Sequence, residues 1–593
     1  MRKGPPFTNK CGPFFVSVYN KERKGKMYRG RVIYLFAGVL IASSVALLNG
    51  CGQWVYKLES PDPFIAFNEI VQQDPPVADD TPVSINDIIT QLYHKSENLL
   101  SETWKSKQNI DQMFFVLRNV SGEGLNPEDY HLSEIEGLTE KIILSDEVDL
   151  EDVVRLEQLL TDAFLLISKD LSEGKANVEA TDLQWKSSRK EVYTDWGKFI
   201  DSTLQNRSII ESLQNLAPRH REYNNLKKAL VQYQRIKEKG GWERFITVLP
   251  KLEKGMRHPD VALLRNRLAI TQGYVEYQTG EEDLFDLALH EQVMLFQLRN
   301  GLETDGVVGK ATIGMMNITV EERIALIEAN LERWRRASRD PGERYIRVNI
   351  AGFELQAIEN DSVVFSTEAI VGQTKRKTPV LSSIMTYMVL NPDWTVPPTI
   401  LREDIIPSVI KNLDYLTEKN LKILRTDGTE VDPSTIDWNT MVGSAFPYRI
   451  YQEPGPGNAL GKVKFMFPNQ YSVYIHDTPG RNLFKRTDRS LSSGCIRINN
   501  PLSLADWLMK DNPAWTPAEI KNVVDKGKAR TIYLANPVPV HILYLTAWAD
   551  DDGVPYFRKD IYDLDQPLLT ALKQSPRERI SNYRLITMNQ GKK

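Results

Sequence analysis

Cysteine is scarce in this chain of 593 residues, which contains only Cys11, Cys51 and Cys495. The first two lie in a basic and apolar leader, so the remaining body is expected to hold a single thiol. One thiol cannot form a disulfide within that body, and a cysteine without a cluster of other ligands is a poor zinc site. We therefore expect no structural disulfide, metal or cofactor. Cys495 is left as either a buried apolar residue or a nucleophile.

The chain also lacks an excess of charge of either sign. It has 74 Lys and Arg against 78 Asp and Glu, which gives a formal net charge of -4. Because no basic excess is available to neutralise phosphates, nucleic acid is not a predicted partner. At this length the chain is expected to divide into several domains.

A long apolar run occurs near the start. Met27 to Arg31 is short and basic, Val32 to Leu48 is apolar, and small residues then precede Cys51. This pattern resembles a bacterial lipoprotein signal, which implies that residues 1–51 are a leader and that Cys51 is acylated and anchors the chain. The alternative is an uncleaved signal anchor, because the run approaches the roughly 20-residue spanning length. Met27 is the preferred start, since the basic stretch before it is long for a signal.

The next two segments carry no predicted chemistry. Residues 52–82 are rich in proline and aspartate and are predicted to be a tether. Residues 83–250 are predicted to be a helical scaffold, since apolar residues recur at three- and four-residue spacings within Val153 to Leu171. A spacer role is the preferred interpretation of that scaffold.

Residues 251–318 form a compact pattern of their own. Apolar spacing predicts one helix around Val261 to Leu268 and a second around Val293 to Gln297, and the glycine-rich stretch Gly301 to Thr312 opens a third. The stretch resembles the peptidoglycan-binding domain 1 family. The resemblance implies a three-helix fold that binds wall glycan or peptide, whereas periodicity alone would also allow a purely architectural bundle.

After a predicted linking helix at 319–343, the pattern changes to strands. Tyr345 to Ile350 and Lys464 to Phe467 alternate apolar and polar residues. A polar helical stretch at about 397–443 interrupts these strands and is predicted to be a cap over a cleft. Its expected buried face consists of Ile405, Val409, Ile410 and Leu413.

The expected fold class is therefore multidomain α+β. A mostly-β domain at 344–546 carries the helical cap, and it follows an all-α scaffold and the small three-helix module. Residues 547–593 are assigned to a C-terminal extension.

The strongest functional signal is a histidine nineteen residues before Cys495. The stretch Tyr471 to His476 alternates as a strand, which places Tyr474 and His476 on one face and predicts that His476 points outward. Residues 495–498 alternate likewise, with Cys495 and Arg497 sharing a face.

This combination favours a cysteine acyl-transfer site. A thiol paired with an imidazole can ionise near neutral pH, and the thiolate is the attacking species. Gly494 permits the tight turn needed if its N–H and that of Cys495 are to form an oxyanion hole. Taken singly, Cys495 and His476 could each have a purely structural role. Ser492 and Ser493 could likewise be ordinary turn residues. His541 lies in a core-strand context and ranks far below as a base.

These residues resemble the L,D-transpeptidase catalytic domain of the YkuD family, whose hallmark is a histidine followed by a Ser-His-Gly-Cys-x-Arg-like stretch. Ser493 stands where many members carry histidine, although large members commonly have serine there. The order of segments is similar to that of large proteobacterial members, and the phrases Gly124 to His131 and Leu160 to Phe164 resemble their helical scaffold.

The resemblance implies a reaction. Cys495 attacks the carbonyl of the third residue of a peptidoglycan tetrapeptide stem and terminal D-Ala leaves. The acyl group passes to an amine of a second stem to form a 3→3 cross-link. His476 takes the thiol proton and later activates the amine, and the Gly494 and Cys495 amides hold the oxyanion. The family is also a carbapenem target.

The resemblance further implies substrate-binding roles. Arg497 either orients the loop or meets a stem carboxylate, with a structural ion pair as the alternative. Tyr474 and Trp394 line the donor cleft, with plain core packing as their alternative. Closure of the cap would exclude water and favour transfer to an amine, and mobility of the cap is a hypothesis.

Other outcomes remain open. With water as acceptor the same acyl-enzyme gives a carboxypeptidase or amidase, and with a lysine side chain it attaches protein to the wall. A wall-binding scaffold with a vestigial thiol is the non-enzymatic alternative. The expected location is the bacterial cell envelope, facing the periplasm and anchored to the membrane through the N-terminal segment.

Overall fold

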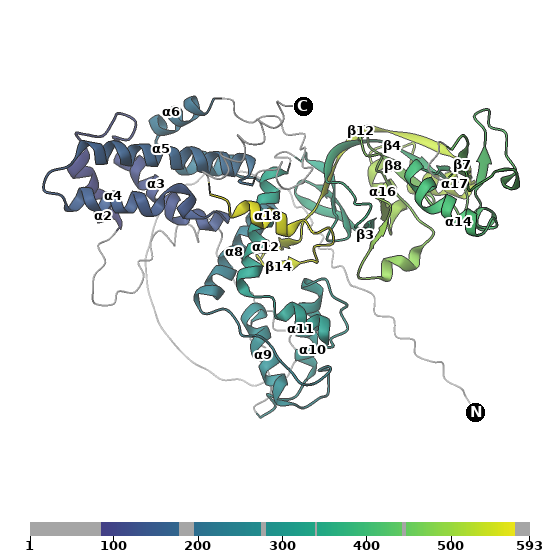
Figure 1. Cartoon of the computed structure of the whole chain (residues 1–593), viewed down its shortest axis with the longest axis horizontal. Helices are drawn as coiled ribbons and strands as arrows, with labels where there is room; N and C mark the ends of the chain where they lie inside the picture. The colour runs from purple at the N-terminus through teal and green to yellow at the C-terminus, as the bar shows by residue number, and fades with distance from the viewer. Residues whose placement is uncertain (1–84, 177–194, 274–279, 338–340, 442–445, 576–593) are drawn as a thin grey trace, which may run out of the picture. The chain divides into compact units, whose positions relative to one another are not determined.

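The computed structural model describes residues 85–176, 195–273, 280–337, 341–441 and 446–575. The predicted leader with Met27 and Cys51, and the tether, lie outside these residues. A helical N-terminal region is followed by a mostly-β region, which confirms the multidomain α+β class (Figure 1). None of the helices in these ranges combines the length and the apolar character that crossing a membrane requires.

Amphipathic helices build the scaffold. On the longest helix, Leu156, Leu160 and Phe164 are fully buried, as their spacing predicts, and Asp149 caps its first turn by accepting from the Glu151 N–H. The helices are α2 (Ile85–Ser96), α3 (Lys107–Asn119), α4 (Leu132–Leu144), α5 (Leu150–Glu173), α6 (Trp196–Asn206), α7 (Ile209–Leu216) and α8 (Arg221–Glu238), with short 3-10 helices at Val120–Glu123 and Pro127–Tyr130.

The predicted three-helix module consists of α9 (Pro259–Gln272), α10 (Leu287–Arg299) and α11 (Lys310–Met316). Val261 and Val293 are fully buried in its small core. Gly306 has a φ of 69°, a left-handed conformation that favours glycine, and its N–H donates to the Gln297 side chain at 2.8 Å. The glycine-rich stretch is thus a tight turn fixed by a buried amide.

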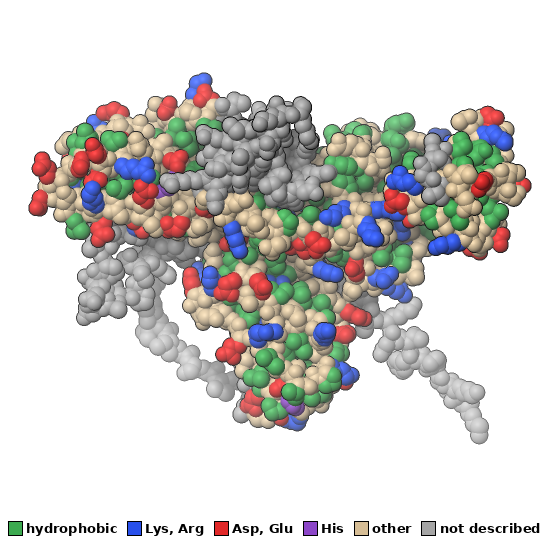
Figure 2. All heavy atoms as spheres, in the orientation of Figure 1, with side chains coloured by type: hydrophobic (Ala, Val, Ile, Leu, Met, Phe, Trp, Pro, Cys, Tyr) green, Lys and Arg blue, Asp and Glu red, His purple; other side chains and the backbone are tan. Residues whose placement is uncertain are grey.

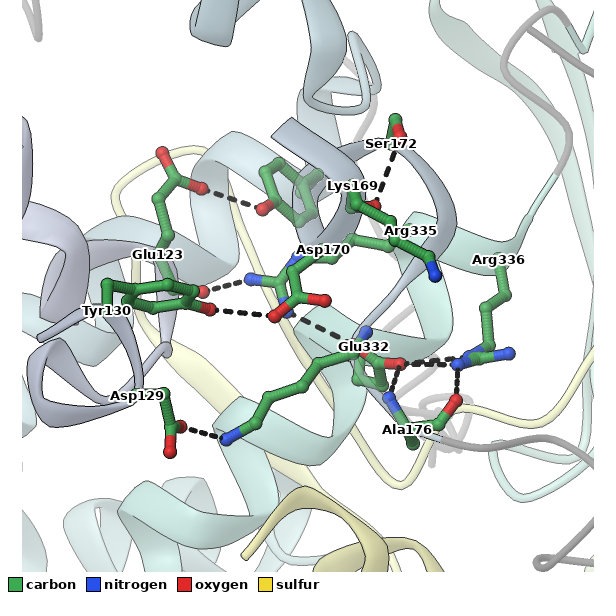
Figure 3. A network of polar contacts seen from close by, with 12 residues as sticks. Glu123, Asp129, Tyr130, Lys169, Asp170, Ser172, Ala176, Glu332, Arg335 and Arg336 are labelled. Carbon is green, nitrogen blue, oxygen red and sulfur yellow. Dashed lines mark hydrogen bonds and ion pairs between the residues drawn. The ribbon is translucent and has the colours of Figure 1, made fainter. Parts of the chain in front are cut away.

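The linking helix α12 (Val320–Arg336) is buried on several sides. It contacts α5, α8, a short strand β13 (Ala547–Ala549) and a C-terminal helix α18 (Asp565–Leu572). Glu332 on this helix is 0% exposed and accepts from the backbone N–H groups of Lys175 and Ala176 at 3.0 and 2.9 Å (Figure 3). Arg335 and Arg336 donate to the same carboxylate at 3.2 and 2.9 Å.

Burial alone would raise the pKa of Glu332. Arg336, Arg335 and the two backbone N–H groups instead lower that pKa from its ordinary value of 4.5 to about 2. The carboxylate is therefore charged and fully partnered inside the protein.

Nine strands form the main sheet, in the order β10-β3-β11-β9-β8-β4-β12-β1-β2. An additional pairing of β2 with β3 closes eight of them into a barrel, which leaves β10 at the margin. Two helices, α16 (Pro501–Met509) and α17 (Pro517–Asp525), pack against its core. The strands are β1 (Arg344–Asn349), β2 (Glu354–Glu359), β3 (Ser362–Gly372), β4 (Leu381–Leu390), β8 (Val463–Met466), β9 (Ile475–His476), β10 (Ser490–Ser492), β11 (Ile496–Ile498) and β12 (Arg530–Leu543).

The cap differs from the purely helical insertion that the sequence predicts. A three-stranded sheet in the order β5-β7-β6 crosses it, and the cap has an apolar core of its own. Ile405 and Val409 are buried as expected, but Ile410, within α14, is 41% exposed, and Leu413, beyond the end of α14 at Lys411, is 39% exposed. The elements are β5 (Trp394–Thr395), α13 (Pro398–Ile400), a π-helix (Leu401–Ile405), α14 (Ile406–Lys411), α15 (Tyr415–Glu418), β6 (Lys422–Leu424), a 3-10 helix (Pro433–Thr435) and β7 (Arg449–Gln452).

The segment assigned to a C-terminal extension contributes to other cores as far as the structure describes it. β13 pairs with β14 (Pro555–Phe557) and packs into the scaffold core. Tyr562 belongs to the core of the barrel. On the face drawn in Figure 2, acidic and basic side chains are interspersed over the described parts.

Replacing Glu332 by Ala should lower the free energy of unfolding by about 3–5 kcal/mol, because it removes the buried carboxylate that pairs with the guanidinium groups of Arg335 and Arg336. The folded-state pKa is depressed, so this contribution is present above pH 4.5 and is lost as the pH falls towards 2. Thermal and urea unfolding at pH 7 and pH 3 measure both effects. Glu134, half-exposed in its pair with Arg155, is the matched control and should change stability by less than about 1 kcal/mol. Equal losses of unfolding free energy for the Glu332 and Glu134 variants would contradict the stabilising role of the Glu332 interactions.

Candidate active site

A cleft of about 1160 Å³ lies between the cap and the barrel. Residues of the cap from Trp394 to Leu421 form one wall, and the ends of β9, β10 and β11 form another. Every predicted site residue among the described ranges lines this cleft: Trp394, Tyr474, His476, Ser493, Gly494, Cys495 and Arg497. Cys51 lies outside the described residues.

Strand register sets which side chains are neighbours. β11 pairs in parallel with β9, with Arg497 opposite His476. The Ile496 N–H donates to the Tyr474 carbonyl at 3.1 Å, so Cys495 enters β11 beside Tyr474. Tyr474 is thus the neighbour of the thiol, and Arg497 the neighbour of the imidazole.

The thiol of Cys495 is protonated at neutral pH. Burial raises its pKa above the ordinary 9.0, while hydrogen bonds with the backbone and hydroxyl of Tyr474, and the charge of Arg497, act in the opposite direction. The pKa of Tyr474 is raised as well, mainly by burial and then by Cys495, and its hydrogen bond with Trp394 partly offsets this. Trp394, Tyr474 and Cys495 therefore form a continuous line of polar contacts.

His476 is 4% exposed, which corrects the expectation that it points outward. Alternation along the strand indicates its face correctly, but the cleft walls cover that face. Its Nδ1 lies 2.5 Å from the Asp477 carbonyl oxygen, which can only accept, so the proton of the neutral ring lies on Nδ1. Burial, and secondarily Arg497, lower the pKa of His476 to about 3. The ring is therefore neutral at pH 7, and Nε2 can accept a proton.

The turn after His476 is fixed by Asp477, a residue that the sequence did not single out. Its carboxylate is 2% exposed and accepts from the backbone N–H groups of Lys462 at 2.7 Å and Thr478 at 2.6 Å. Arg481 also donates to it. The buried carboxylate holds the carbonyl that orients the imidazole.

The Gly494 turn is shaped by Ser492. Gly494 has a φ of 114° and its N–H donates to the Ser492 hydroxyl at 3.1 Å. That hydroxyl donates in turn to the Cys495 carbonyl at 2.6 Å. The Gly494 amide, predicted as an oxyanion donor, is thus already engaged with a side chain.

A loop after β3 supports the same turn. Thr378 donates through its hydroxyl to the Gly494 carbonyl at 2.8 Å. The Tyr562 hydroxyl accepts from the Thr378 N–H at 3.0 Å and donates to the Gly372 carbonyl at 2.6 Å. Sequence reasoning missed both residues, because neither lies near the Cys495 motif along the chain.

Arg376, on this loop, joins the barrel to the cap. Its guanidinium donates to both oxygens of Asp404 at 2.6 and 2.8 Å and to Glu403 at 2.9 Å, within the π-helix of the cap. It also donates to the Ser493 hydroxyl at 2.9 Å. We call Arg376, Glu403, Asp404 and Ser493 the cap latch.

Arg497 faces the cleft with unused hydrogen-bonding capacity. Its Nε is buried and has no hydrogen-bond partner among the described residues. Burial lowers its pKa, and Cys495 and Tyr474 act against that shift. In the ranges that the structure describes, no group of three His, Cys, Asp or Glu side chains is placed to hold a metal ion.

Comparisons with known proteins match three segments of the chain to described families. Residues 343–532 match the family described as "L,D-transpeptidase catalytic domain" (YkuD), residues 88–230 match a "Scaffold domain", and residues 257–316 match a "Putative peptidoglycan binding domain". A curated relative, "Putative L,D-transpeptidase" from Haemophilus influenzae, is 36% identical over 226 residues. The match covers 38% of this chain and 45% of that relative, so it spans about half of the relative's length.

Solved structures also show similarity. A crystal structure of an L,D-transpeptidase from Xylanimonas cellulosilytica is 16% identical and covers 50% of this chain and 99% of its own, with a TM-score of 0.18. An L,D-transpeptidase from Mycobacterium smegmatis is 12% identical and covers 34% of this chain and 58% of its own, with a TM-score of 0.16. These TM-scores are too low to carry a structural argument. The three family matches follow one another along the chain: the scaffold-domain match comes first, the peptidoglycan-binding match second and the L,D-transpeptidase (YkuD) match last, and each is a similarity of that segment alone.

Proposed function

We propose that this protein is a peptidoglycan L,D-transpeptidase that forms 3→3 cross-links through an acyl-enzyme on Cys495. The observation that carries the proposal is the cleft itself, in which the single described cysteine lies with a neutral buried imidazole and an arginine of unused capacity. The cleft is open to a peptide and large enough for one, since pockets of roughly 300–1,000 Å³ hold drug-sized ligands.

In the first step the Cys495 sulfur attacks the carbonyl carbon of the third residue of a tetrapeptide stem, and the thiol proton passes to Nε2 of His476. The tetrahedral intermediate collapses when the amine of the terminal D-Ala leaves with that proton. A thioester to the tripeptide remains. In the second step His476 takes a proton from an amine of another stem, the amine attacks the thioester, and the thiol is restored.

The oxyanion is assigned first to the backbone N–H of Cys495. The Gly494 N–H becomes a second donor only if the Ser492 hydroxyl gives up its hydrogen bond to it. The Nε of Arg497 is a suitable donor to a stem carboxylate, because charge-assisted bonds to guanidinium groups are strong. Tyr474 and Trp394 line the donor side of the cleft.

The surrounding regions are consistent with action at the wall. The family matches to peptidoglycan domains support a cell-envelope location and peptidoglycan as substrate. Residues 251–318 would hold the chain on the wall, residues 319–343 would link this module to the catalytic domain, and the N-terminal segment would anchor it through Cys51 on the periplasmic side.

Replacing Cys495 by Ala should reduce turnover by at least about a thousandfold, because it removes the nucleophile. The substrate is a disaccharide-tetrapeptide with diaminopimelate as third residue, and intact mass reads the products. A dimer that has lost one D-Ala from the wild-type protein supports 3→3 transpeptidation. Tripeptide monomer alone would instead assign carboxypeptidase activity or a protein acceptor. Turnover that persists in the variant, which should keep wall binding and its melting temperature, would refute the mechanism.

Replacing Tyr474 by Phe should move the ionisation of Cys495 to higher pH by up to about one unit, because one hydrogen bond to the thiolate is lost. The rate of alkylation by iodoacetamide as a function of pH measures this. The wild-type rate should rise only above pH 9, with no step near pH 6.5, because His476 stays neutral down to about pH 3. Tyr415→Phe, another tyrosine of the cleft, is the control. If the midpoint pH of the alkylation rate is unchanged or lower in Tyr474→Phe, the hydrogen bond from Tyr474 does not stabilise the Cys495 thiolate.

Replacing Arg376 by Ala should raise hydrolysis relative to transfer several-fold, because it releases the cap and lets water reach the thioester. The ratio of tripeptide monomer to cross-linked dimer measures the effect. Arg402→Ala is the matched control, since Arg402 pairs with Glu403 inside the cap and is 62% exposed. Ser493→Ala removes one arm of the cap latch and should have a smaller effect. If the Arg376 and Arg402 variants give the same ratio, the cap latch does not control water.

A further inference from the structure

Three arginines from different helices surround a small cavity away from the cleft. Arg267 lies on α9, Arg299 on α10 and Arg323 on α12, and together they line a cavity of about 20 Å³. Arg267 is 6% exposed and Arg323 is 4% exposed. Positive charge is thus concentrated where the three-helix module meets the linking helix.

The bonds of these arginines leave part of each guanidinium unused. Arg267 donates through Nε and Nη2 to the Met316 carbonyl at 3.2 and 2.8 Å. Arg323 donates through Nη2 to Asn300 at 2.7 Å and to the Met315 carbonyl at 2.9 Å.

Three donor atoms remain: Nη1 of Arg267, Nη1 of Arg323 and Nε of Arg299 are buried and have no hydrogen-bond partner in the part of the chain that the structure describes. Within the same part, no carboxylate lies at ion-pair distance from any of the three, although the charge of Glu322 acts on Arg323 from farther away. A buried guanidinium without an anion is unfavourable, since buried charges are normally paired.

Aromatic rings hold two of the guanidinium groups in place. Trp242 lies 4.2 Å from Arg267 and Phe557 lies 4.2 Å from Arg323, measured from the guanidinium carbon to the ring centre. Burial lowers the pKa of both arginines to about 10, so both remain charged at neutral pH. The positions are fixed and the charge is present without a ligand.

A groove of about 340 Å³ adjoins the cavity and shares part of its wall, namely Tyr233, Thr271, Val554 and Pro555. Its other walls combine aliphatic Ile236 and Ile270 with basic Arg235 and Lys239. The cavity holds roughly one water-sized group, which suits a carboxylate oxygen and is too small for a phosphate. The adjoining groove has room for a short aliphatic group attached to that carboxylate.

We propose that the junction of Arg267, Arg299 and Arg323 is a binding site for the free carboxylate at the end of a short peptide. The carboxylate accepts from the unused guanidinium donors, and the groove holds the residues that precede it. Stem peptides of peptidoglycan carry such ends. That link to the wall rests on the proposed function, whereas binding of the carboxylate does not.

The test is fluorine NMR of the full chain with Cys495→Ala, labelled with 5-fluorotryptophan. The Trp242 signal, assigned from Trp242→Phe, reports on the site because this ring contacts Arg267. N-acetyl-alanine is the probe. Its methyl amide, which keeps the rest of the molecule but lacks the carboxylate, is the matched control. A saturable shift with the acid and none with the amide is expected. Equal shifts with both compounds, or none with the acid because water alone occupies the cavity, would overturn the proposal.

Arg299→Gln should weaken binding of the acid at least tenfold, and Arg299→Lys should retain part of it. Arg257→Gln removes an arginine of the same module that is paired with Glu281 and Asp283, and it should leave the titration unchanged. Melting temperatures establish that each variant is folded. If Arg299→Gln binds N-acetyl-alanine with unchanged affinity, the acid binds at another site. Because the probe and the Trp242 readout involve no turnover, this result is separate from the outcome of the transpeptidase assay.

Discussion

The buried carboxylate of Glu332 is the constraint on which the arrangement around α12 depends. A charge with no exposure must be partnered, and its partners come from the residues just after α5 and from α12 itself (Figure 3). On another face of the helix, Arg333 forms an ion pair with Asp565 at 2.6 Å and donates to Thr546 at 2.9 Å. A helix with charges buried on several faces cannot lie on a surface. The scaffold, the end of the barrel and the C-terminal segment therefore have to close around it.

The ion pair of Arg333 with Asp565 connects α12 to the candidate active site through the C-terminal segment. Asp565 begins α18, and shortly before it the Tyr562 hydroxyl holds both ends of the loop from Gly372 to Thr378. That loop supports the carbonyl of Gly494. Asp560 and Tyr544 join Asp565 to Tyr562, so a series of buried and partly buried hydrogen bonds leads from α12 to the turn that presents Cys495. The helical region thus helps to position the Cys495 turn, although none of its described side chains lines the cleft.

Local sequence pattern was sufficient to predict which residues line the cleft, but it was insufficient to predict the residues that hold them in position. The motif around Cys495 and the strand entering His476 could be predicted, as could the buried faces of α5 and the three-helix module. The burial of His476 could not be predicted, because alternation along a strand shows which face a side chain is on but not what covers that face. The strands of the cap were missed since each is two to four residues long and they pair across a long insertion. Tyr562 and Arg376 act over long separations in sequence, where periodicity carries no information.

The charges in the cleft set a condition on the proposed reaction. The charge of Arg497 acts to lower the pKa of Cys495, against the larger effect of burial, and it also lowers the pKa of His476. Arg497 therefore favours the thiolate but opposes the imidazolium that forms with it. In the free protein both groups are neutral, and transfer of the proton is unfavourable. A stem carboxylate bound to the unused Nε of Arg497 would offset the arginine charge and make the imidazolium less costly. Proton transfer would then be easiest when a stem peptide occupies the cleft, which protects the thiol from ionising when no substrate is bound.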